Sequence, residues 1–298
     1  MGNCETCTSV DRKASANVAL KDSSETEEGG ASKFLELPDF CPEAVKQSYQ
    51  KLGPFQIVDL SGADIPAPKE LDNGVIYQGQ WADNQRVGYG RQIWPDGSVY
   101  EGMWANNMAN GEGRLIHSGG DVYEGEWVND KAEGKGVYLH QDGASYTGEW
   151  VDDKQNGYGV EKWVDGAQYE GYFKDGLKEG HGIFIWSEGS KYEGEFKNSN
   201  IEGFGHYLWA DGREYEGHWR NNKMHGRGIF VWADGRRYDG EYVADKKEGT
   251  GEFSWPDGRC YKGSWKNGKQ DGKGIYTNKE GVEREGIWVN GKKIRWVD

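Results

Sequence analysis

The chain has 298 residues and a formal net charge of −14, because 50 acidic residues outnumber 36 basic ones. A surface with this excess of negative charge repels phosphate backbones, which excludes nucleic acid as an expected partner. Hydrophobic residues make up only 35% of the chain, whereas glycine occurs 47 times. We therefore exclude one thick globular core and expect aromatic rings to supply most of the buried area.

The cysteine content and the hydropathy of the sequence indicate the cellular compartment of the protein. The chain has four cysteines and no apolar signal segment at its start, which argues against a secreted, disulfide-bonded protein. No apolar stretch approaches the roughly 18 residues needed to span a bilayer. We expect the protein to be made and kept on the cytosolic side of a membrane.

The first seven residues match a lipidation signal. They read Met-Gly-Asn-Cys-Glu-Thr-Cys, which fits Met-Gly-x-x-x-Ser/Thr with two cysteines close behind the glycine. The match predicts myristoylation of Gly2 after removal of Met1 and palmitoylation of Cys4, with Cys7 as a further candidate. A second acyl chain is required, because one myristoyl chain gives a membrane affinity of only about 10⁴ M⁻¹ and no polybasic segment is present.

The same two cysteines also fit the spacing of a metal or redox pair. Structural zinc would need two further ligands and redox chemistry a thioredoxin-like fold, and neither is evident near Cys4 and Cys7. We therefore favour acylation and expect no metal or other cofactor. Residues 8–32 are small, polar and acidic, so residues 1–32 together predict an acylated, disordered, acidic tether.

A short amphipathic helix is predicted over residues 42–52. Proline stands at its first position, glycine follows its end, and three apolar residues share one side, namely Val45, Tyr49 and Leu52. The helix either covers the open edge before the first hairpin or docks a partner, and we favour the cover. With the irregular connector over residues 54–72, residues 33–76 then form a helix and connector that cap the first repeat.

Tyrosine recurs every 23 residues in the rest of the chain, each time two residues before a glycine and four before an aromatic residue. These tyrosines are Tyr77, Tyr100, Tyr123, Tyr146, Tyr169, Tyr192, Tyr215, Tyr238 and Tyr261. A fixed short period is typical of stacked-repeat proteins, so one unit is copied nine times.

Each unit predicts an antiparallel β-hairpin. In the seventh unit, Tyr215, Gly217 and Trp219 share one face of a first strand, and after a polar six-residue turn Gly226, Gly228, Phe230 and Trp232 share one face of the return strand. We infer that each Gly-x-Gly leaves room for an aromatic ring on the sheet. The same positions in the second unit are Tyr100, Gly102, Trp104, Gly111 and Gly113.

The hairpins should join into one elongated, single-layer, twisted antiparallel sheet, an all-β solenoid with a short N-terminal helix. A glycine ends every inter-repeat turn, which suits positive φ. The outer face of the first strands carries glutamate pairs such as Glu193 with Glu195, so we expect that face to be solvated. Residues 284–288 look like a tenth first strand without its tyrosine, so residues 77–298 hold nine repeats plus a degenerate tenth half-repeat.

The pattern Tyr-x-Gly-x-Trp, six turn residues, Gly-x-Gly and Asp-Gly on a 23-residue cycle resembles the MORN (membrane occupation and recognition nexus) repeat family over residues 77 to about 290. The resemblance implies a module for scaffolding at membrane and cytoskeleton junctions, as in ciliary and protist cortical proteins. The family also occurs fused to phosphoinositide kinases and lysine methyltransferases, but the residues outside the repeats here are too few for either catalytic domain.

No constellation of residues predicts catalysis. The histidines occupy unrelated repeat positions, and carboxylates recur on every unit, so no acid pair or nucleophile stands out. These histidines are His117, His140, His181, His206, His218 and His225. The aromatic rows could be read as a stacking platform for sugars or bases, but packing against glycine is the simpler interpretation.

Any aromatic surface left uncovered by the single sheet predicts a partner, either a second copy in a homodimer or a helix laid along the groove. We therefore interpret the chain as a lipid-anchored, non-catalytic scaffold that links cytoskeletal or ciliary proteins to the cytosolic face of a plasma, cortical or ciliary membrane. Two alternatives stay open. One is an axonemal structural component, and the other is a phosphoinositide-binding repeat module contacting lipid through Lys292, Lys293 and Arg295.

Overall fold

The computed structural model describes residues 34, 36–55 and 65–297. The chain divides into two units, Met1–Leu35 and Glu36–Asp298, and the second holds every described helix and strand. The predicted lipidation residues Gly2, Cys4 and Cys7 lie outside the described residues.

The described secondary structure is one helix and a long series of short strands. Helix α1 spans Glu43–Leu52, and the strands are β1 (Lys69–Glu70), β2 (Ile76–Ala82), β3 (Gln85–Ile93), β4 (Val99–Ala105), β5 (Met108–Ile116), β6 (Val122–Val128), β7 (Lys131–Leu139), β8 (Ser145–Val151), β9 (Lys154–Lys162), β10 (Gln168–Lys174), β11 (Leu177–Ile185), β12 (Lys191–Lys197), β13 (Asn200–Leu208), β14 (Glu214–Arg220), β15 (Lys223–Val231), β16 (Arg237–Val243), β17 (Lys246–Ser254), β18 (Cys260–Lys266), β19 (Lys269–Thr277), β20 (Glu283–Val289) and β21 (Lys292–Trp296).

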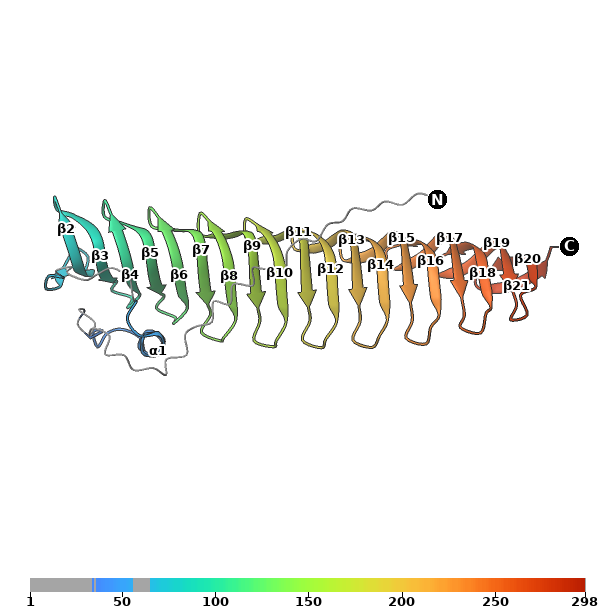
Figure 1. Ribbon diagram of the computed structural model, residues 1–298, viewed down its shortest axis with the longest axis horizontal. Helices are drawn as coiled ribbons and strands as arrows, with labels where there is room; N and C mark the ends of the chain where they lie inside the picture. Colours follow the sequence, from blue (N-terminus) through green and yellow to red (C-terminus); the bar gives the residue numbers. More distant parts are fainter. Residues whose placement is uncertain (1–33, 35, 56–64, 298) are drawn as a thin grey trace, which may run out of the picture. The chain divides into compact units, whose positions relative to one another are not determined.

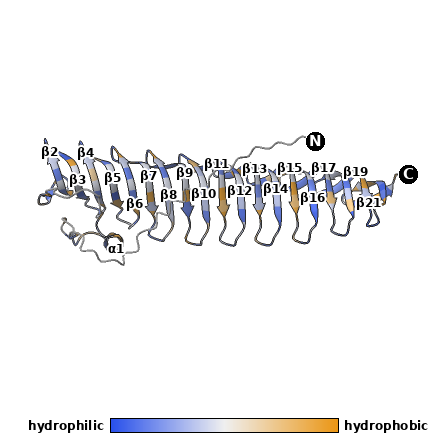
Figure 2. Cartoon of the chain, viewed as in Figure 1, coloured by the Kyte–Doolittle hydropathy of each residue, from blue (hydrophilic) through white to orange (hydrophobic). Residues whose placement is uncertain are grey.

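All the strands belong to one open antiparallel sheet in which each strand pairs with the next along the chain. In Figure 1 the hairpins follow one another in chain order along this unit, from β2 at one end to β21 at the other. Figure 2 shows hydrophobic and hydrophilic residues intermixed along the strands, as expected when each strand has two different faces. The predicted fold class, a single-layer sheet of tandem hairpins with a short N-terminal helix, is confirmed.

The turn inside each hairpin is shorter than the six residues predicted. In the seventh unit only Asn221 and Asn222 connect β14 to β15, with φ angles of 48° and 61°. Two consecutive residues with positive φ are typical of the tight type I′ turn, whose twist matches that of the paired strands, and Asn tolerates this conformation. The polar residues that we assigned to the turn therefore belong to longer strands.

The turn between repeats follows the prediction. In the turn after β15, Gly235 has a φ of 85°, and its amide donates to the carbonyl of Trp232 at 2.8 Å. The amide of Trp232 in turn donates to the carbonyl of Arg236 at 2.8 Å. Glycine is favoured at such a turn because it adopts positive φ without a steric penalty.

One row of glycines crosses the sheet and makes room for the aromatic rings. Every strand from β2 to β20 places one glycine opposite a glycine on each neighbouring strand of this series, from Gly79 to Gly286. A Cβ added to Gly113 would collide with the ring and hydroxyl of Tyr100. The second glycine of each Gly-x-Gly thus has the predicted role.

The first glycine of each Gly-x-Gly has a different role from the one we predicted. In the seventh unit Gly226 has a φ of 66°, and a Cβ added there would meet the Cβ of His218 at 3.3 Å on the outer face, not an aromatic ring. The register of β14 with β15 shifts between Gly217 and Trp219, opposite this glycine. A β-bulge at this position needs positive φ, which explains why a glycine recurs at the position of Gly226 in the repeats.

Helix α1 is present as predicted but does not cover the edge of the sheet. It packs on the outer face of β3 to β6, where Val45 is completely buried. The sheet residues beneath it are apolar, namely Ile93, Val99, Ile116 and Val122. Three of the four equivalent positions three repeats later are polar, namely Lys162, Gln168 and Lys191, so the corresponding surface there is less apolar. The edge itself is paired by β1, which comes from the predicted connector.

The degenerate tenth unit forms a hairpin whose second strand is short, with five residues against nine in the other repeats. Strand β20 pairs with β21, and Asn290 and Gly291 form the connecting turn with φ angles of 49° and 82°. Arg284 stands in the tyrosine position, so Gly286 is covered by the ring of Trp288 instead. Degenerate side chains did not prevent the hairpin, because backbone pairing with β19 and the two-residue turn are both retained.

Candidate functional site: the aromatic face of the sheet

The repeat tyrosines form a buried row over the glycines. Apart from Tyr123, which is 3% exposed, each of the nine is no more than 1% exposed. Their hydroxyls donate to backbone carbonyls three residues on, as Tyr100 does to Met103 at 3.0 Å. Burial, assisted by the negative charge of Asp130, raises the pKa of Tyr100 above its ordinary value. Each ring is therefore a neutral, fixed part of the scaffold and not an acid or a base.

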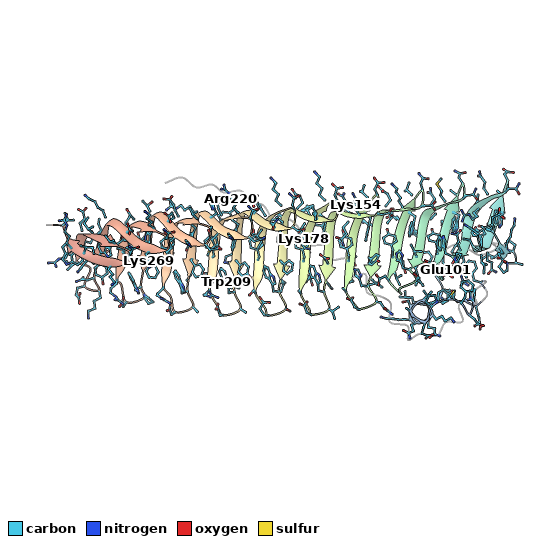
Figure 3. All side chains as sticks on the ribbon, turned by 180° about the vertical axis from the view of Figure 1, so that it is seen from behind. Glu101, Lys154, Lys178, Trp209, Arg220 and Lys269 are labelled. Atoms are coloured by element: carbon cyan, nitrogen blue, oxygen red, sulfur yellow. The ribbon has the colours of Figure 1, made fainter. Side chains whose placement is uncertain are left out.

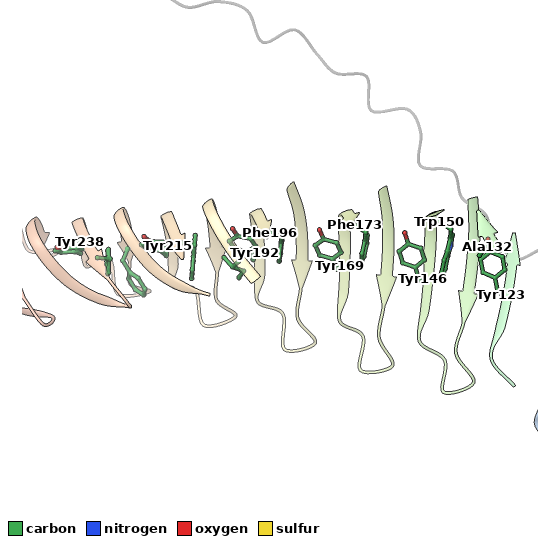
Figure 4. Close-up of a cluster of buried hydrophobic side chains, with 14 of the residues drawn as sticks. Tyr123, Ala132, Tyr146, Trp150, Tyr169, Phe173, Tyr192, Phe196, Tyr215 and Tyr238 are labelled. Atoms are coloured by element: carbon green, nitrogen blue, oxygen red, sulfur yellow. The ribbon is translucent and has the colours of Figure 1, made fainter. Parts of the chain in front are cut away.

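The tryptophans at the ends of the first strands join neighbouring repeats. The ring of Tyr100 is edge-to-face with Trp104 of its own repeat at 5.1 Å and with Trp127 of the next at 5.3 Å. The indole of Trp127 also donates to the carbonyl of Gly113 at 3.0 Å, which ties the third repeat to the second. Figure 4 shows this alternation further along, with Trp150 and Phe173 edge-on between the tyrosine rings. The predicted repeat-defining residues are thus brought together.

A second row of rings borders the tyrosines, and its tryptophans are only partly buried. It comes from the second strands and the inter-repeat turns, and the rings pack side by side, as between Trp209 and Phe230 at 5.3 Å. The tryptophans of this row are Trp94, Trp163, Trp186, Trp209, Trp232 and Trp255. The aromatic face therefore has a closed inner row and an outer row that solvent or a partner can reach.

Sequence reasoning missed a set of cations on this face. The second residue of each second strand lies on this face, and in four repeats it is a cation, namely Arg86, Lys178, Lys247 and Lys293. The guanidinium of Arg86 lies 4.4 Å from the ring centroid of Trp104. Lys178 lies 5.0 Å from the centroid of Tyr169 and forms an ion pair with Glu161 at 2.7 Å. A repeat-by-repeat comparison of this single position would have shown that its residue type varies between units.

Lys247 occupies the most enclosed of these positions. Its ammonium lies 4.8 Å from the ring centroid of Trp232, 5.1 Å from Tyr238, 4.7 Å from Phe253 and 5.1 Å from Trp265. Four rings facing one cation form an aromatic cage. Burial, together with the charge of nearby Arg236, lowers the pKa of Lys247 to about 8.

The outer face beneath α1 holds a buried ion pair. The Arg91 guanidinium contacts the Glu101 carboxylate at 2.5 Å, with exposures of 3% and 2%. The same carboxylate accepts the hydroxyl of Tyr49 at 2.9 Å and the amide of Phe55 at 2.9 Å. Figure 3 places Glu101 at the end of the sheet beside the helix. Because each polar group of this cluster has a hydrogen-bonding or ionic partner, the cluster holds the helical segment on the sheet.

The remaining outer face is solvated, as predicted for the glutamate pairs. Glu193 and Glu195 are exposed, and the Glu252–Lys262 ion pair is open, at 3.7 Å with exposures of 43% and 73%. Our expectation of a solvated outer face is wrong only under α1, where the equivalent pair is Arg91 with Glu101. The segment that covers this end lies too far away in sequence for the strand pattern to show it.

The predicted anionic-lipid contacts do not converge on one face. Lys293 lies opposite Trp288 on the aromatic face, and its ammonium is 3.8 Å from the ring centroid of Trp296. Arg295 lies opposite Ile287 and Lys292 opposite Val289, both on the outer face. All three basic residues are exposed. Their proposed contact with lipid stays a prediction.

Residues 34, 36–55 and 65–297 contain no group of three or more His, Cys, Asp or Glu side chains arranged to hold a metal ion. Among the same residues, no helix is long and apolar enough to cross a membrane. The histidines are scattered over the sheet, as the sequence indicated: His117 lies beside Tyr138 with ring centroids 6.1 Å apart, and His206 pairs with Glu214 at 3.4 Å.

These features define the class of protein, a tandem β-hairpin repeat scaffold whose two faces differ in chemistry. The MORN repeat family model matches nine consecutive segments, residues 77–99, 100–122, 123–145, 146–168, 169–191, 192–212, 215–236, 238–258 and 261–282. The chain belongs to the MORN repeat family. Membership indicates a repeat scaffold for protein or membrane interactions.

Solved structures with some similarity include two TCP-type domains in complex with peptides. The TCP10 domain of Danio rerio CPAP, in complex with a peptide of Danio rerio STIL, is 13% identical, covers 78% of this chain and 98% of its own, and has a TM-score of 0.42. The TCP domain of Drosophila melanogaster SAS-4, bound to a proline-rich motif of Ana2, is 17% identical, covers 52% of this chain and 85% of its own, and has a TM-score of 0.32. These similarities are too weak to bear on function. No curated protein matches the chain.

Proposed function

We propose that this protein is a non-catalytic MORN-repeat scaffold, anchored by N-terminal acylation to the cytosolic face of a membrane and linking that membrane to cytoskeletal or ciliary proteins. The observation that carries the scaffold role is the repeated aromatic face of an open sheet, which offers the same surface again in successive repeats. The sheet is built by structural glycines and buried tyrosines, and these residues are fully engaged in packing. The partly buried outer row of rings is the surface that a partner would contact.

The anchor rests on the motif at Gly2 with Cys4 and Cys7 behind it. Net charge supports an acyl anchor over a purely electrostatic one, because a chain with a net charge of −14 is repelled by an anionic leaflet. The basic residues near the end of the chain are divided between two faces of β21, which weakens them as a single lipid site.

Cell fractionation tests the anchor directly. Gly2→Ala removes the myristoylation acceptor, so the membrane-bound fraction should fall to background, and Cys4→Ser should reduce it strongly because one acyl chain anchors weakly. Gly29→Ala, a glycine outside the motif, is the matched control and should leave the fraction unchanged. Equal membrane recovery of the Gly2→Ala and Gly29→Ala proteins would refute the acyl anchor.

Liposome sedimentation of the unacylated full chain separates this proposal from direct lipid recognition. We expect no binding to neutral vesicles or to vesicles containing phosphoinositide. Phosphoinositide-selective binding that is lost in the double variant Lys292→Glu, Arg295→Glu would favour the phosphoinositide-binding module instead. Analytical ultracentrifugation of the same preparation tests the homodimer, which a single monomeric species at micromolar concentration would exclude.

A further inference from the structure

The Lys247 cage has a counterpart in the second repeat that lacks its lysine. Ala109 stands where Lys247 stands in the eighth repeat, 138 residues or six periods of 23 earlier. The surrounding side chains correspond in the same way and are Trp94, Tyr100, Leu115 and Trp127, with leucine in place of one phenylalanine. Because the two repeats have the same backbone register, these side chains surround the space that a lysine at residue 109 would fill.

That space is a real hollow in the aromatic face. It measures about 340 Å³, and its lining contains Ala109 and all four of the corresponding side chains. Ala109 itself is buried against the sheet and fills none of the volume beyond its methyl group. The hollow therefore resembles the cage around Lys247, with three rings and Leu115 around it and no lysine at residue 109.

The rim of the hollow carries a carboxylate that the Lys247 cage lacks. Asp130 lines the hollow, and one of its carboxylate oxygens accepts the amide of Ala109 at 2.6 Å. The position equivalent to Asp130 beside Lys247 is Gly268, which has no side chain. Arg86 also lines the hollow, but its guanidinium stacks on Trp104 and bonds to Gln92 and to the carbonyl of Asn107. The negative charge of Asp130 offsets the positive charge of Arg86.

We propose that the hollow at Ala109 is a binding site for a lysine side chain presented by a partner polypeptide. The occupant is identified by the chain itself, since Lys178 and Lys247 fill the corresponding places in two other repeats with an alkyl stem and an ammonium. The stem would lie against Leu115 and the rings, and the ammonium would face the rings and the Asp130 carboxylate. The inference concerns the sheet alone and holds whether or not the chain is acylated.

The test uses the full chain with ¹⁵N-labelled tryptophan and the probe Nα-acetyl-lysine N-methylamide. Saturable shifts of the Trp94 and Trp127 indole signals at millimolar probe are expected. The norleucine analogue, which has a similar stem without the ammonium, should bind at least tenfold more weakly. Equal binding of the two probes would show a merely apolar groove and overturn the proposal.

Two complementary variants locate the site. Ala109→Lys should fill the hollow from within and weaken probe binding at least tenfold, whereas Gln270→Lys, the same change at the equivalent position of the ninth repeat, should alter it less than twofold. Lys247→Ala should create a second site, detected by new shifts at Trp232 and Trp265. If the Ala109→Lys chain failed to fold, the gain of a site in Lys247→Ala would decide the question. Absence of both effects would overturn the assignment.

Discussion

The two ends of the sheet are built from the same unit, yet their outer faces differ. Under α1, the outer positions of β3 to β6 are apolar and Arg91 pairs with Glu101 out of contact with water. At the other end, the equivalent pair Glu252 with Lys262 is solvated. The aromatic face is nearly the same at both ends, because each tyrosine sits over the same paired glycines. A repeat can therefore keep its core constant and vary one face for a local purpose.

The difference between the outer faces of the two ends is tested most strongly by substitutions in the two ion pairs. Arg91→Met leaves Glu101 buried without its cation and should cost about 3–5 kcal/mol of local stability. Lys262→Met removes the equivalent partner from an exposed pair and should change stability by less than about 1 kcal/mol. Hydrogen exchange of the β3–β4 and β17–β18 amides measures each end separately. Similar losses at both ends would contradict the distinction between a buried and a solvated outer face.

The glycine row should show no such difference between the ends. Gly113→Ala and Gly228→Ala each force a Cβ into a tyrosine ring and should each cost about 1–3 kcal/mol, by overpacking. Gly226→Ala, which only places a side chain at positive φ, should cost about 1–2 kcal/mol. Thermal unfolding of the variants gives the comparison. A Gly113→Ala chain much less stable than Gly228→Ala would mean that α1 also supports the aromatic core.

The docking of α1 can be weakened without touching the ion pair. Val45→Ala removes two buried methyl groups from the contact with the sheet and should cost about 2 kcal/mol. Amide exchange within α1 should accelerate accordingly, while amides of β14 to β17 keep their rates. Val243→Ala, at a side chain that is 48% exposed on the uncovered part of the sheet, is the control and should stay within about 0.5 kcal/mol.

The smallest effect expected is a pH dependence from the aromatic face. The pKa of Lys247 falls to about 8 from its ordinary value of 10.5 on folding. Between these values the unfolded chain binds a proton that the folded chain lacks, so the contribution of Lys247 to stability rises with pH across this window and is constant below it. Lys247→Met should remove that rise, and Lys246→Met, at an exposed neighbour, should keep it. Denaturant midpoints at pH 7.5 and 9.5 would show the difference, and identical pH profiles for the two variants would contradict it.

The sequence by itself determined the fold class, because a tyrosine repeated every 23 residues with glycines at fixed offsets can be satisfied only by identical stacked units. It also located the inter-repeat turns, where glycine is required at positive φ, and the solvated glutamates of the outer face. The two-residue hairpin turns were present as Asn/Asp pairs in five repeats and as one Asn or Asp beside Gly, Ser or Ala in the others, but the polar residues of the surrounding strands hid them.

Only the tertiary structure decided where α1 lies and what the second residue of each return strand does. The contact between α1 and the sheet brings together residues that are far apart in sequence, such as Tyr49 and Glu101, so no local pattern could reveal it. The lysine cage at Lys247 and the empty one at Ala109 combine rings from three successive repeats, and their enclosure depends on how those repeats pack. Periodicity specifies each unit, whereas contacts between units fix the surfaces that make one repeat different from the next.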